Sequence, residues 1–280
     1  MSSFFTALVF WAMLKWDNEA DNPDKPHADR WIIFTFYMMG LSIGVHLLCL
    51  LVIPALTMIY YFRRYKVTQW GTFFAFIVGC LLTGFVQVFV IQYSVKLGAM
   101  FDVFFVNTLG MPFNSGSYAF IILLAVLVFL GIRWSVKNGR YLLQMGLLCF
   151  TFLMFGYATY FTTLIRSNAN PAIDMFNVDN PVSLLGYLNR QQYGDWPLLY
   201  GPDFDSQIKR DANGYAVTKN KGVEYEKADK KYEVSGNRIA YEYQDGEENL
   251  FPRVWNSDNW QGHADFYRDW LNLGKKEKQK

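Results

Sequence analysis

Residues 31–62 read WIIFTFYMMGLSIGVHLLCLLVIPALTMIYYF, and this stretch decides the fold. It contains no Lys, Arg, Asp or Glu, and His46 is its one side chain that titrates near neutral pH. A helix needs roughly 20 apolar residues to cross a hydrocarbon core of about 30 Å, so the stretch belongs in a membrane. At 32 residues it is too long for one span. Gly40, Gly44 and Pro54 predict a break and a kink inside it.

The 280 residues divide into two parts of unlike composition. Apolar residues dominate up to about Ile165, whereas Asp, Asn, Lys and Tyr are frequent in the remainder. We therefore expect residues 1–165 to form a transmembrane helical region and residues 166–280 to form an extracytoplasmic α+β region. The net charge of +2 gives no case for a nucleic-acid partner.

The apolar pattern predicts an α-helical polytopic membrane protein with about six membrane helices. The first, over 3–16, is short for a span and lacks the features of a signal peptide, so we expect the chain to begin inside a longer protein's membrane helix. The others are expected at about 31–41, 45–62, 70–93, 118–134 and 141–165. A loop over 94–117 is expected to carry Asp102, Asn107 and Asn114.

Basic residues in short connections predict the orientation, because cytoplasmic loops carry an excess of Lys and Arg. Two clusters stand out: Arg63, Arg64 and Lys66, and Arg133, Lys137 and Arg140. We place both clusters in the cytoplasm, and the 94–117 loop and the polar half outside it. The side of residues 17–30 depends on whether the first long apolar stretch crosses the membrane once or twice.

The polar half shows three patterns of regular structure. A short helix is expected over about 181–192 and a final helix over about 262–273. Strands at 231–234 and 238–243 flank Ser235–Asn237, which predicts a β-hairpin with its turn at those three residues.

His46 is the first candidate site residue. Ionisable residues inside a membrane are costly and often functional, so His46 is a candidate for contact with a substrate or a lipid phosphate. The alternative is a neutral histidine that hydrogen-bonds to a neighbouring helix beside the break.

The segment RSNANPAID, residues 166–174, is the second candidate. The Arg166 guanidinium matches phosphate oxygens, and Asn168 and Asp174 can hold sugar hydroxyls. The same residues also make a good helix exit with Asx-turns ahead of Pro171, and both interpretations stay open.

The third candidate is YLNRQQYGDWPLLYG, residues 187–201. Amide, acidic, basic and aromatic groups together suit carbohydrate or pyrophosphate binding. Alternatively, the aromatic residues only seat the polar half on the membrane surface. The residues concerned are Asn189, Arg190, Tyr193, Asp195 and Trp196.

The sequence lacks the common phosphate-binding and metal-binding motifs. It has no glycine-rich phosphate loop, no metal-ligand cysteine pair and no HExxH, and its three histidines lie far apart in the sequence. We therefore expect no metal site and no bound cofactor.

Three segments carry a resemblance to a known family: residues 30–56 (RWIIFTFYMMGLSIGVHLLCLLVIPAL), 104–116 (FFVNTLGMPFNSG) and 166–201. They resemble a bacterial family of multi-spanning membrane proteins of unknown function, related to the vertebrate endoplasmic-reticulum protein O-mannosyltransferase that modifies plexin-type domains. The resemblance implies the glycosyltransferase-C architecture, with a polyprenyl-phosphate sugar donor and an acceptor protein as partners. It also implies a multi-pass protein of the cell inner membrane whose C-terminal half is periplasmic.

The sequence departs from that family at the catalytic acid. The family carries a tryptophan–acid–glycine–acid motif in its first external loop, and residues 16–19 (WDNE) do not match it. The resemblance therefore implies that the acid precedes Met1 and that the chain is an internal fragment, inactive alone. It gives Arg166 and Arg190 the role of binding the donor phosphate. Contact with sugar or acceptor is implied for His46, Asn168, Asp174, Asn189, Tyr193, Asp195 and Trp196.

Two other functions remain open from the sequence. A transporter or flippase component would use the broken apolar stretch as its substrate site, as discontinuous helices often do. A non-catalytic membrane anchor would present the polar half to a partner protein.

Overall fold

The computed structural model describes residues 1–174, 177–189, 197, 199–252 and 263–272. The chain forms two compact units. Unit 1 comprises Met1–Asn189 together with Lys227–Tyr232, and unit 2 comprises Arg190–Glu226 and Glu233–Lys280.

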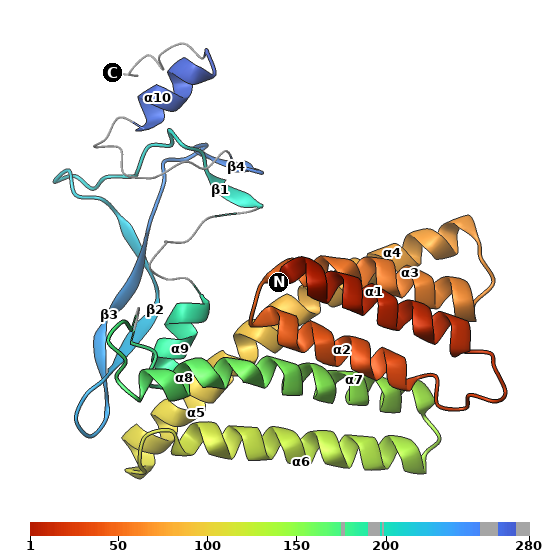
Figure 1. Ribbon diagram of the computed structural model, residues 1–280. Coiled ribbons are helices and arrows are strands. Elements are labelled where there is room, and N and C mark those ends of the chain that lie inside the picture. The colour runs from red at the N-terminus through yellow and green to blue at the C-terminus, as the bar shows by residue number, and fades with distance from the viewer. Residues whose placement is uncertain (175–176, 190–196, 198, 253–262, 273–280) are drawn as a thin grey trace. The chain divides into compact units, whose positions relative to one another are not determined.

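Unit 1 is a bundle of helices (Figure 1). Neighbouring helices pack in the order α6, α7, α2, α1, α3 and α4, and α5 packs against α6 and α9. The helices are α1 (Ser2–Glu19), α2 (Arg30–Ile43), the 3-10 helix η1 (Leu47–Val52), α3 (Ile53–Arg64), α4 (Gln69–Phe85), the π-helix η2 (Val86–Tyr93), α5 (Ser94–Leu109), α6 (Ser115–Lys137), α7 (Tyr141–Tyr157), the 3-10 helix η3 (Ala158–Tyr160), α8 (Phe161–Ser167) and α9 (Pro181–Leu188).

Among the described residues, four helical stretches are long and apolar enough to cross a membrane. Their outer faces are apolar as well, since Leu127 and Phe129 on α6 are 58% and 63% exposed. The chain is therefore an α-helical polytopic membrane protein with a C-terminal α+β region, as predicted. The four stretches are Leu47–Arg64, Gln69–Leu109, Ser115–Lys137 and Tyr141–Ser167, and α2 is a shorter apolar helix.

The long apolar stretch folds back on itself at Gly44–His46. His46 has an extended backbone, and its Nδ1 accepts a hydrogen bond from the Leu48 N–H at 3.0 Å, which caps η1. At the end of α3, Arg64 Nη2 lies 3.7 Å from Oδ1 of Asp29, the residue just before α2. Both ends of the stretch thus lie at one end of the bundle, and the stretch passes through the bundle twice.

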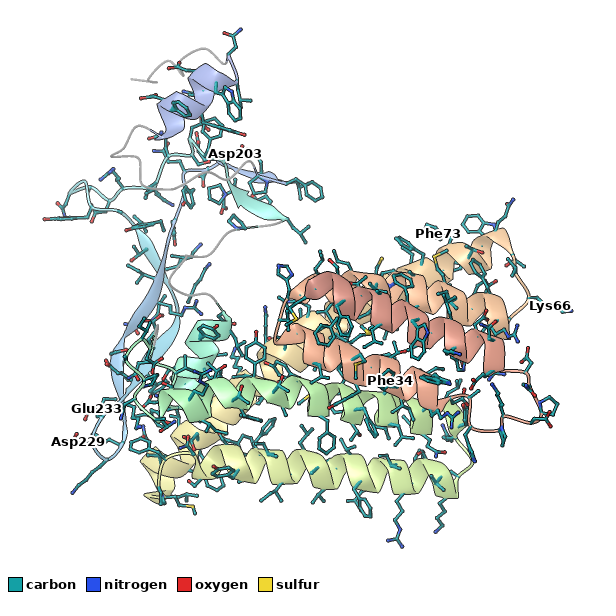
Figure 2. All side chains as sticks on the ribbon, viewed as in Figure 1. Phe34, Lys66, Phe73, Asp203, Asp229 and Glu233 are labelled. Atoms are coloured by element: carbon teal, nitrogen blue, oxygen red, sulfur yellow. The ribbon has the colours of Figure 1, made fainter. Side chains whose placement is uncertain are left out.

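A charged and aromatic cluster joins several helices at that end. Asp29 accepts a hydrogen bond from Trp16 Nε1 at 2.9 Å and another from the Tyr141 hydroxyl. Trp16 is fully buried. Tyr141 begins α7 directly after the second basic cluster, so both basic clusters lie at this end, and Figure 2 shows Lys66 in the α3–α4 connection.

The loop predicted over 94–117 is wrong except at residues 110–114, because residues 94–109 lie in α5 and residues 115–117 lie in α6. The helix that begins with α4 continues through η2 and α5 as far as Leu109 and ends at Gly110, which has a positive φ of 65°. Lys96 and Asp102 made this segment resemble a loop, but both side chains have partners. Lys96 lies over the Tyr93 ring at 5.4 Å, and Asp102 is buried against α6.

A π-helix interrupts this long helix. In η2 the backbone hydrogen bonds span five residues rather than four, a rare arrangement that often marks functional sites. The buried Tyr157 hydroxyl of α7 donates to the Ile91 carbonyl of η2 at 3.0 Å. This bond fixes η2 to α7 inside the bundle.

Helix pairs of the bundle touch through glycines. A Cβ on Gly40 would overlap the Leu153 carbonyl oxygen, and one on Gly156 would meet the α2 backbone. The backbones of α2 and α7 are therefore in direct contact, as in small-residue packing of membrane helices. Gly79 gives the same close approach between α3 and α4, and Gly116 between α5 and α6.

Unit 2 contains two small sheets and a helix. The strands β1 (Tyr200–Pro202) and β4 (Glu248–Leu250) pair antiparallel. The helix α10 (His263–Trp270) packs on the segment after β1, where Arg268 Nη2 lies 2.8 Å from Asp205 Oδ2. The Phe204 and Tyr267 rings meet edge to face at 4.5 Å between centroids.

The second sheet is a hairpin of β2 (Thr218–Lys227) and β3 (Tyr232–Tyr241). Its turn is not at Ser235–Asn237 as predicted, because those residues lie inside β3. The chain turns instead at residues 228–231, where the Ala228 N–H donates to the Lys231 carbonyl at 3.0 Å, and Figure 2 labels Asp229 in this turn.

Candidate functional site

The structure describes five of the nine predicted site residues. Arg190, Tyr193, Asp195 and Trp196 lie outside the described residues, so their roles stay predictions. The other five belong to unit 1: His46, Arg166, Asn168, Asp174 and Asn189.

His46 lies exposed in the turn between α2 and η1. Because its Nδ1 accepts the capping hydrogen bond from Leu48, the neutral ring carries its proton on Nε2. Nε2 is then a donor for an oxygen ligand. The turn lies against η3, where the Tyr160 hydroxyl donates to the Ile43 carbonyl at 3.4 Å.

Arg166 lies exposed in the last turn of α8. Within the described part of the chain, no carboxylate forms an ion pair with it. A guanidinium at a helix C-terminus interacts favourably with the helix dipole and still has its donors available for an anion.

The polar residues after Arg166 form a hydrogen-bonded helix exit. Asn168 Nδ2 donates to the carbonyls of Leu164 at 2.8 Å and Asp179 at 2.9 Å, which uses both amide hydrogens. Asp174 Oδ2 accepts a hydrogen bond from Ser167 Oγ at 2.5 Å. These bonds fit the structural alternative for this segment, and they also hold the chain in place beside Arg166.

Asn189 lies at the C-terminal end of α9, where its backbone N–H donates to the Leu185 carbonyl at 3.0 Å. His46 and Arg166 lie at the same end of the bundle, because the His46 turn contacts η3 and η3 leads directly into α8. The Arg64–Asp29 cluster lies at the opposite end.

The structure also reveals a buried carboxylate that the sequence interpretation missed. Asp102 on α5 is fully buried, and its Oδ1 accepts hydrogen bonds from the N–H groups of Gly116 at 3.0 Å and Ser117 at 3.4 Å. Its Oδ2 accepts from the Asn114 N–H at 3.0 Å and from the Tyr232 hydroxyl at 2.7 Å. Asp102 therefore caps the N-terminus of α6 from a neighbouring helix, where a negative charge is favoured.

Tyr232 is fixed on its other sides as well. The Asn107 side chain donates to the Tyr232 carbonyl and accepts from its N–H, both at 2.8 Å. Phe113 meets the Tyr232 ring edge to face at 5.1 Å. Burial raises the pKa of Tyr232, and the hydrogen bond to Asp102 raises this pKa further, so the hydroxyl stays protonated and donates to the carboxylate.

Lys227 also holds segment 227–232 against the rest of unit 1. Its Nζ lies 2.6 Å from Asp179 Oδ2 and 5.3 Å from the Phe113 ring centroid. Burial acts to raise the pKa of Asp179, but the hydrogen bonds from Lys227 and Asn180 outweigh it and lower the pKa. We call the residues that hold segment 227–232 in unit 1 the tip clamp: Asp102, Asn107, Phe113, Asp179, Lys227 and Tyr232.

The sequence contains one signal that points to the buried carboxylate. Asp102 is the sole Asp or Glu between Asp29 and Asp174. An isolated acid in an apolar segment must be paired or functional. Its contact with Tyr232 had no comparable signal, because the two residues are 130 positions apart.

A cavity of about 470 Å³ lies within unit 1, bounded by α5, α6, α7, α8 and α9. Asn114 and Ser117, which the Asp102 carboxylate holds, contribute to its wall. Among the described residues, no group of three His, Cys, Asp or Glu side chains is placed to hold a metal ion.

Comparisons with known proteins match both ends of the chain. Residues 1–69 match the protein O-mannosyl-transferase TMEM260 N-terminal domain, and residues 194–280 match a family of unknown function (DUF8416). The first match covers α1, α2, η1 and α3 and relates this part of the chain to a glycosyltransferase family of membrane proteins. No curated protein and no solved structure matches the chain.

Proposed function

We propose that this protein is part of a membrane glycosyltransferase that moves a sugar from a polyprenyl-phosphate donor to a protein hydroxyl. The reaction takes place on the non-cytoplasmic side of the cell inner membrane. The match of residues 1–69 to an O-mannosyl-transferase domain supports the reaction class.

The distribution of basic residues between the two ends of the bundle supports a reaction on the non-cytoplasmic side. Both basic clusters lie at the end where Arg64 contacts Asp29, and cytoplasmic connections are the ones enriched in Lys and Arg. His46 and Arg166 lie at the opposite end. The chain leaves the bundle after α8 at that end, so the polar half would follow on the non-cytoplasmic, periplasmic side.

Arg166 is the residue on which the proposal depends. It is exposed where the last membrane stretch ends, and no acid in the described part of the chain neutralises it. When the sugar leaves the donor, negative charge collects on the polyprenyl phosphate, and a guanidinium at this position stabilises that charge. The Nε2–H of His46 is a second donor at the same end of the bundle.

Deprotonation of the acceptor hydroxyl requires a carboxylate base. Asp102 is unsuited to this step, because both of its oxygens already accept hydrogen bonds and it is fully buried.

The test is transfer from a labelled polyprenyl-phosphate sugar to protein, in membranes of cells that express the protein. We expect Arg166→Ala to lower transfer at least about tenfold, because it removes one charge-assisted hydrogen bond to the phosphate. Arg166→Lys should keep part of the transfer activity. Arg133→Ala is the matched control, because Arg133 is an exposed arginine at the end of α6, on the opposite side of the bundle. Equal transfer by wild type and Arg166→Ala at equal expression would reject the role of Arg166.

The interpretation as a transporter depended on a substrate site in the broken apolar stretch. A substrate site in a discontinuous span lies near the bilayer midplane. Here the break at Gly44–His46 is a reversal between α2 and η1 at one end of the bundle, not a gap inside one span. A membrane anchor without catalysis predicts no transfer in the same assay, with either wild type or variants.

A further inference from the structure

The ribbon formed by β1 and β4 in unit 2 ends in a group of exposed apolar side chains (Figure 1). Tyr200 lies directly opposite Leu250, and next to this pair the Phe251 N–H donates to the Leu199 carbonyl at 2.7 Å. Side chains of opposite residues are neighbours across the two strands. The four side chains are 59–73% exposed, and a contiguous exposed apolar group marks an interaction surface. We call Leu199, Tyr200, Leu250 and Phe251 the apolar tip.

The apolar tip is the outer end of the ribbon, because the chain bends back on both sides of it. A Cβ on Gly201 would lie 2.5 Å from Pro197 Cβ and 4.0 Å from Pro252 Cγ. Pro197 precedes the tip and Pro252 follows it, yet both lie against the ribbon at the level of Gly201. The four apolar side chains therefore project beyond the two prolines.

The backbone of Phe251 is unusual for so large a residue. Its φ is 53°, in the left-handed region that glycine and asparagine adopt more easily than an aromatic residue. The ring is 73% exposed, so packing within the described part of the chain does not explain a phenylalanine at this bend. Residues held in such a conformation cluster at functional sites, which points to a partner for the ring outside the fold.

The distribution of the apolar side chains favours a lipid surface as that partner. Tyr200 and Leu250 share one face of the ribbon, whereas Leu199 points toward the other, because successive residues of a strand alternate between faces. A flat protein surface would cover only one of these faces. A bilayer surrounds an inserted end on all sides, and a tyrosine is favourable at the level of its headgroups.

Charged and polar residues directly behind the apolar tip set the depth of insertion. Glu248 lies opposite Pro202, and Asn249 Nδ2 donates to Asp203 Oδ2 at 2.8 Å. Glu248 is two residues from Leu250, a rise of roughly 7 Å along a strand. Interfacial elements insert their apolar side to about 5–10 Å, so the tip has the length of one such insertion. The acidic residues behind it give no attraction to anionic lipids.

Two chain connections keep the apolar tip close to the membrane bundle. Asn189 is the last residue of unit 1 before unit 2, and Tyr200 is 11 positions further along, a connection of at most about 40 Å. Residues 227–232, between the strands of the hairpin, also belong to unit 1. Because unit 2 is tethered in this way, a weak affinity of the tip for lipid is sufficient for binding.

We propose that the apolar tip inserts into the interface of the bilayer that holds unit 1. The surface is separate from the phosphate site assigned to Arg166, and its insertion does not depend on transferase activity. The proposal develops the membrane-seating interpretation of residues 187–201. It adds Leu250 and Phe251, which no local sequence signal connects with that segment.

Quenching by lipid nitroxides tests the insertion in the full chain. In a background with Cys49, Cys80 and Cys149 replaced, Leu250→Cys carries the fluorophore NBD, and the protein is placed in phosphatidylcholine nanodiscs. A nitroxide near the headgroup end of the acyl chain should lower NBD emission at least about twofold, because the tip reaches this depth.

Tyr215→Cys with the same label is the matched control for this measurement. Tyr215 is 73% exposed in unit 2, and its backbone N–H donates to Asp211 in a polar turn, so its label should not be quenched. Equal, weak quenching at both positions would overturn the proposal, since the tip would then lie in water or against protein.

A variant of the apolar tip tests the contribution of the Phe251 ring. Phe251→Asn removes the ring, and asparagine tolerates the positive φ, so the fold is retained. We expect it to reduce the quenching of the label at position 250 at least about twofold, because apolar area that enters the lipid is lost. Phe266→Asn removes a ring that is 63% exposed on α10 and should leave the quenching unchanged. Full quenching in a folded Phe251→Asn protein would contradict the role of Phe251.

Salt separates apolar insertion from charge attraction. Raising the salt concentration from about 0.05 M to about 0.5 M screens ionic contacts and should leave the quenching unchanged. A loss of quenching would show that charges hold unit 2 on the lipid and would contradict the proposal. Arg166→Ala should also leave the quenching unchanged. Because the measurement needs neither sugar donor nor acceptor, insertion of the tip and sugar transfer can fail independently.

Discussion

At the scale of single residues, the Asp102 carboxylate stabilises both the start of α6 and the position of Tyr232. A buried carboxylate is stable only when its oxygens are paired, and here three backbone N–H groups and one hydroxyl supply the hydrogen bonds. The same side chain thus caps α6, orders the α5–α6 connection and holds Tyr232. This saturation argues for a structural rather than catalytic role.

Tyr232→Phe tests this role. The variant keeps the ring contact with Phe113 and the backbone bonds to Asn107, but removes the donor to Asp102. A hydrogen bond to a charged group contributes about 1.5–3 kcal/mol, so we expect the free energy of unfolding in detergent to fall by that amount. Tyr118→Phe, at the start of α6 and 66% exposed, is the control and should change little.

Asp102→Asn extends the same test. It leaves part of the α6 N-terminus without an acceptor, so it should cost more than Tyr232→Phe. The double variant should be less destabilised than the sum of the two single variants, because both remove the same hydrogen bond. Additive effects would show that Tyr232 and Asp102 do not interact.

At the scale of elements, the apolar helices were the most predictable feature. The expected helices over 118–134 and 141–165 agree with α6 and with α7 through α8 to within a few residues, because their apolar runs are long and end at polar residues. The extension of the α4 helix to Leu109 was missed, because local sequence does not reveal that Lys96 and Asp102 find partners within a helix. The hairpin turn was misplaced because Ser-Gly-Asn is a strong local turn signal, whereas the observed turn depends on contacts of the tip clamp.

The candidate site was predictable to a similar degree. An ionisable side chain in an apolar run and an arginine at a helix exit are visible in sequence, so His46 and Arg166 could be chosen. That the chain brings them to one end of the bundle follows only from the reversal at Gly44–His46. The cavity was not predictable, because it forms between α6 and α7 through their packing against α5 and α9.

Packing of α2 on α7 gives a prediction at this scale. Gly156→Leu would drive a side chain into the α2 backbone, and overpacking costs about 1–3 kcal/mol or more. We expect a clear loss of thermal stability in detergent. Gly146→Leu on the same helix is the control, because a Cβ there has no atom within 4 Å. Equal stability of the two variants would show that Gly156 does not set the helix contact.

At the scale of the whole molecule, the double passage of the apolar stretch determines the topology. It returns the chain to the end that carries Asp29, so the acidic connection between α1 and α2 lies beside Arg63 and Arg64. The acids of this connection therefore lie among basic groups. The acidic bias of residues 17–30 is thereby explained by ion pairing rather than by a location away from the basic clusters.

This topology predicts the labelling of engineered cysteines in intact cells. In a background with Cys49, Cys80 and Cys149 replaced, Lys66→Cys should react with a membrane-impermeant maleimide only after lysis, because the α3–α4 connection lies at the basic end of the bundle, which we propose to be cytoplasmic. Asn170→Cys, just after α8, should react in intact cells once the outer permeability barrier is opened. Labelling of both positions under the same condition would place them on one side of the membrane, which three crossings between them, by Gln69–Leu109, Ser115–Lys137 and Tyr141–Ser167, do not allow. Reversed labelling would keep the fold but would move His46 and Arg166 to the cytosol, and the proposed transfer on the non-cytoplasmic side would then be wrong.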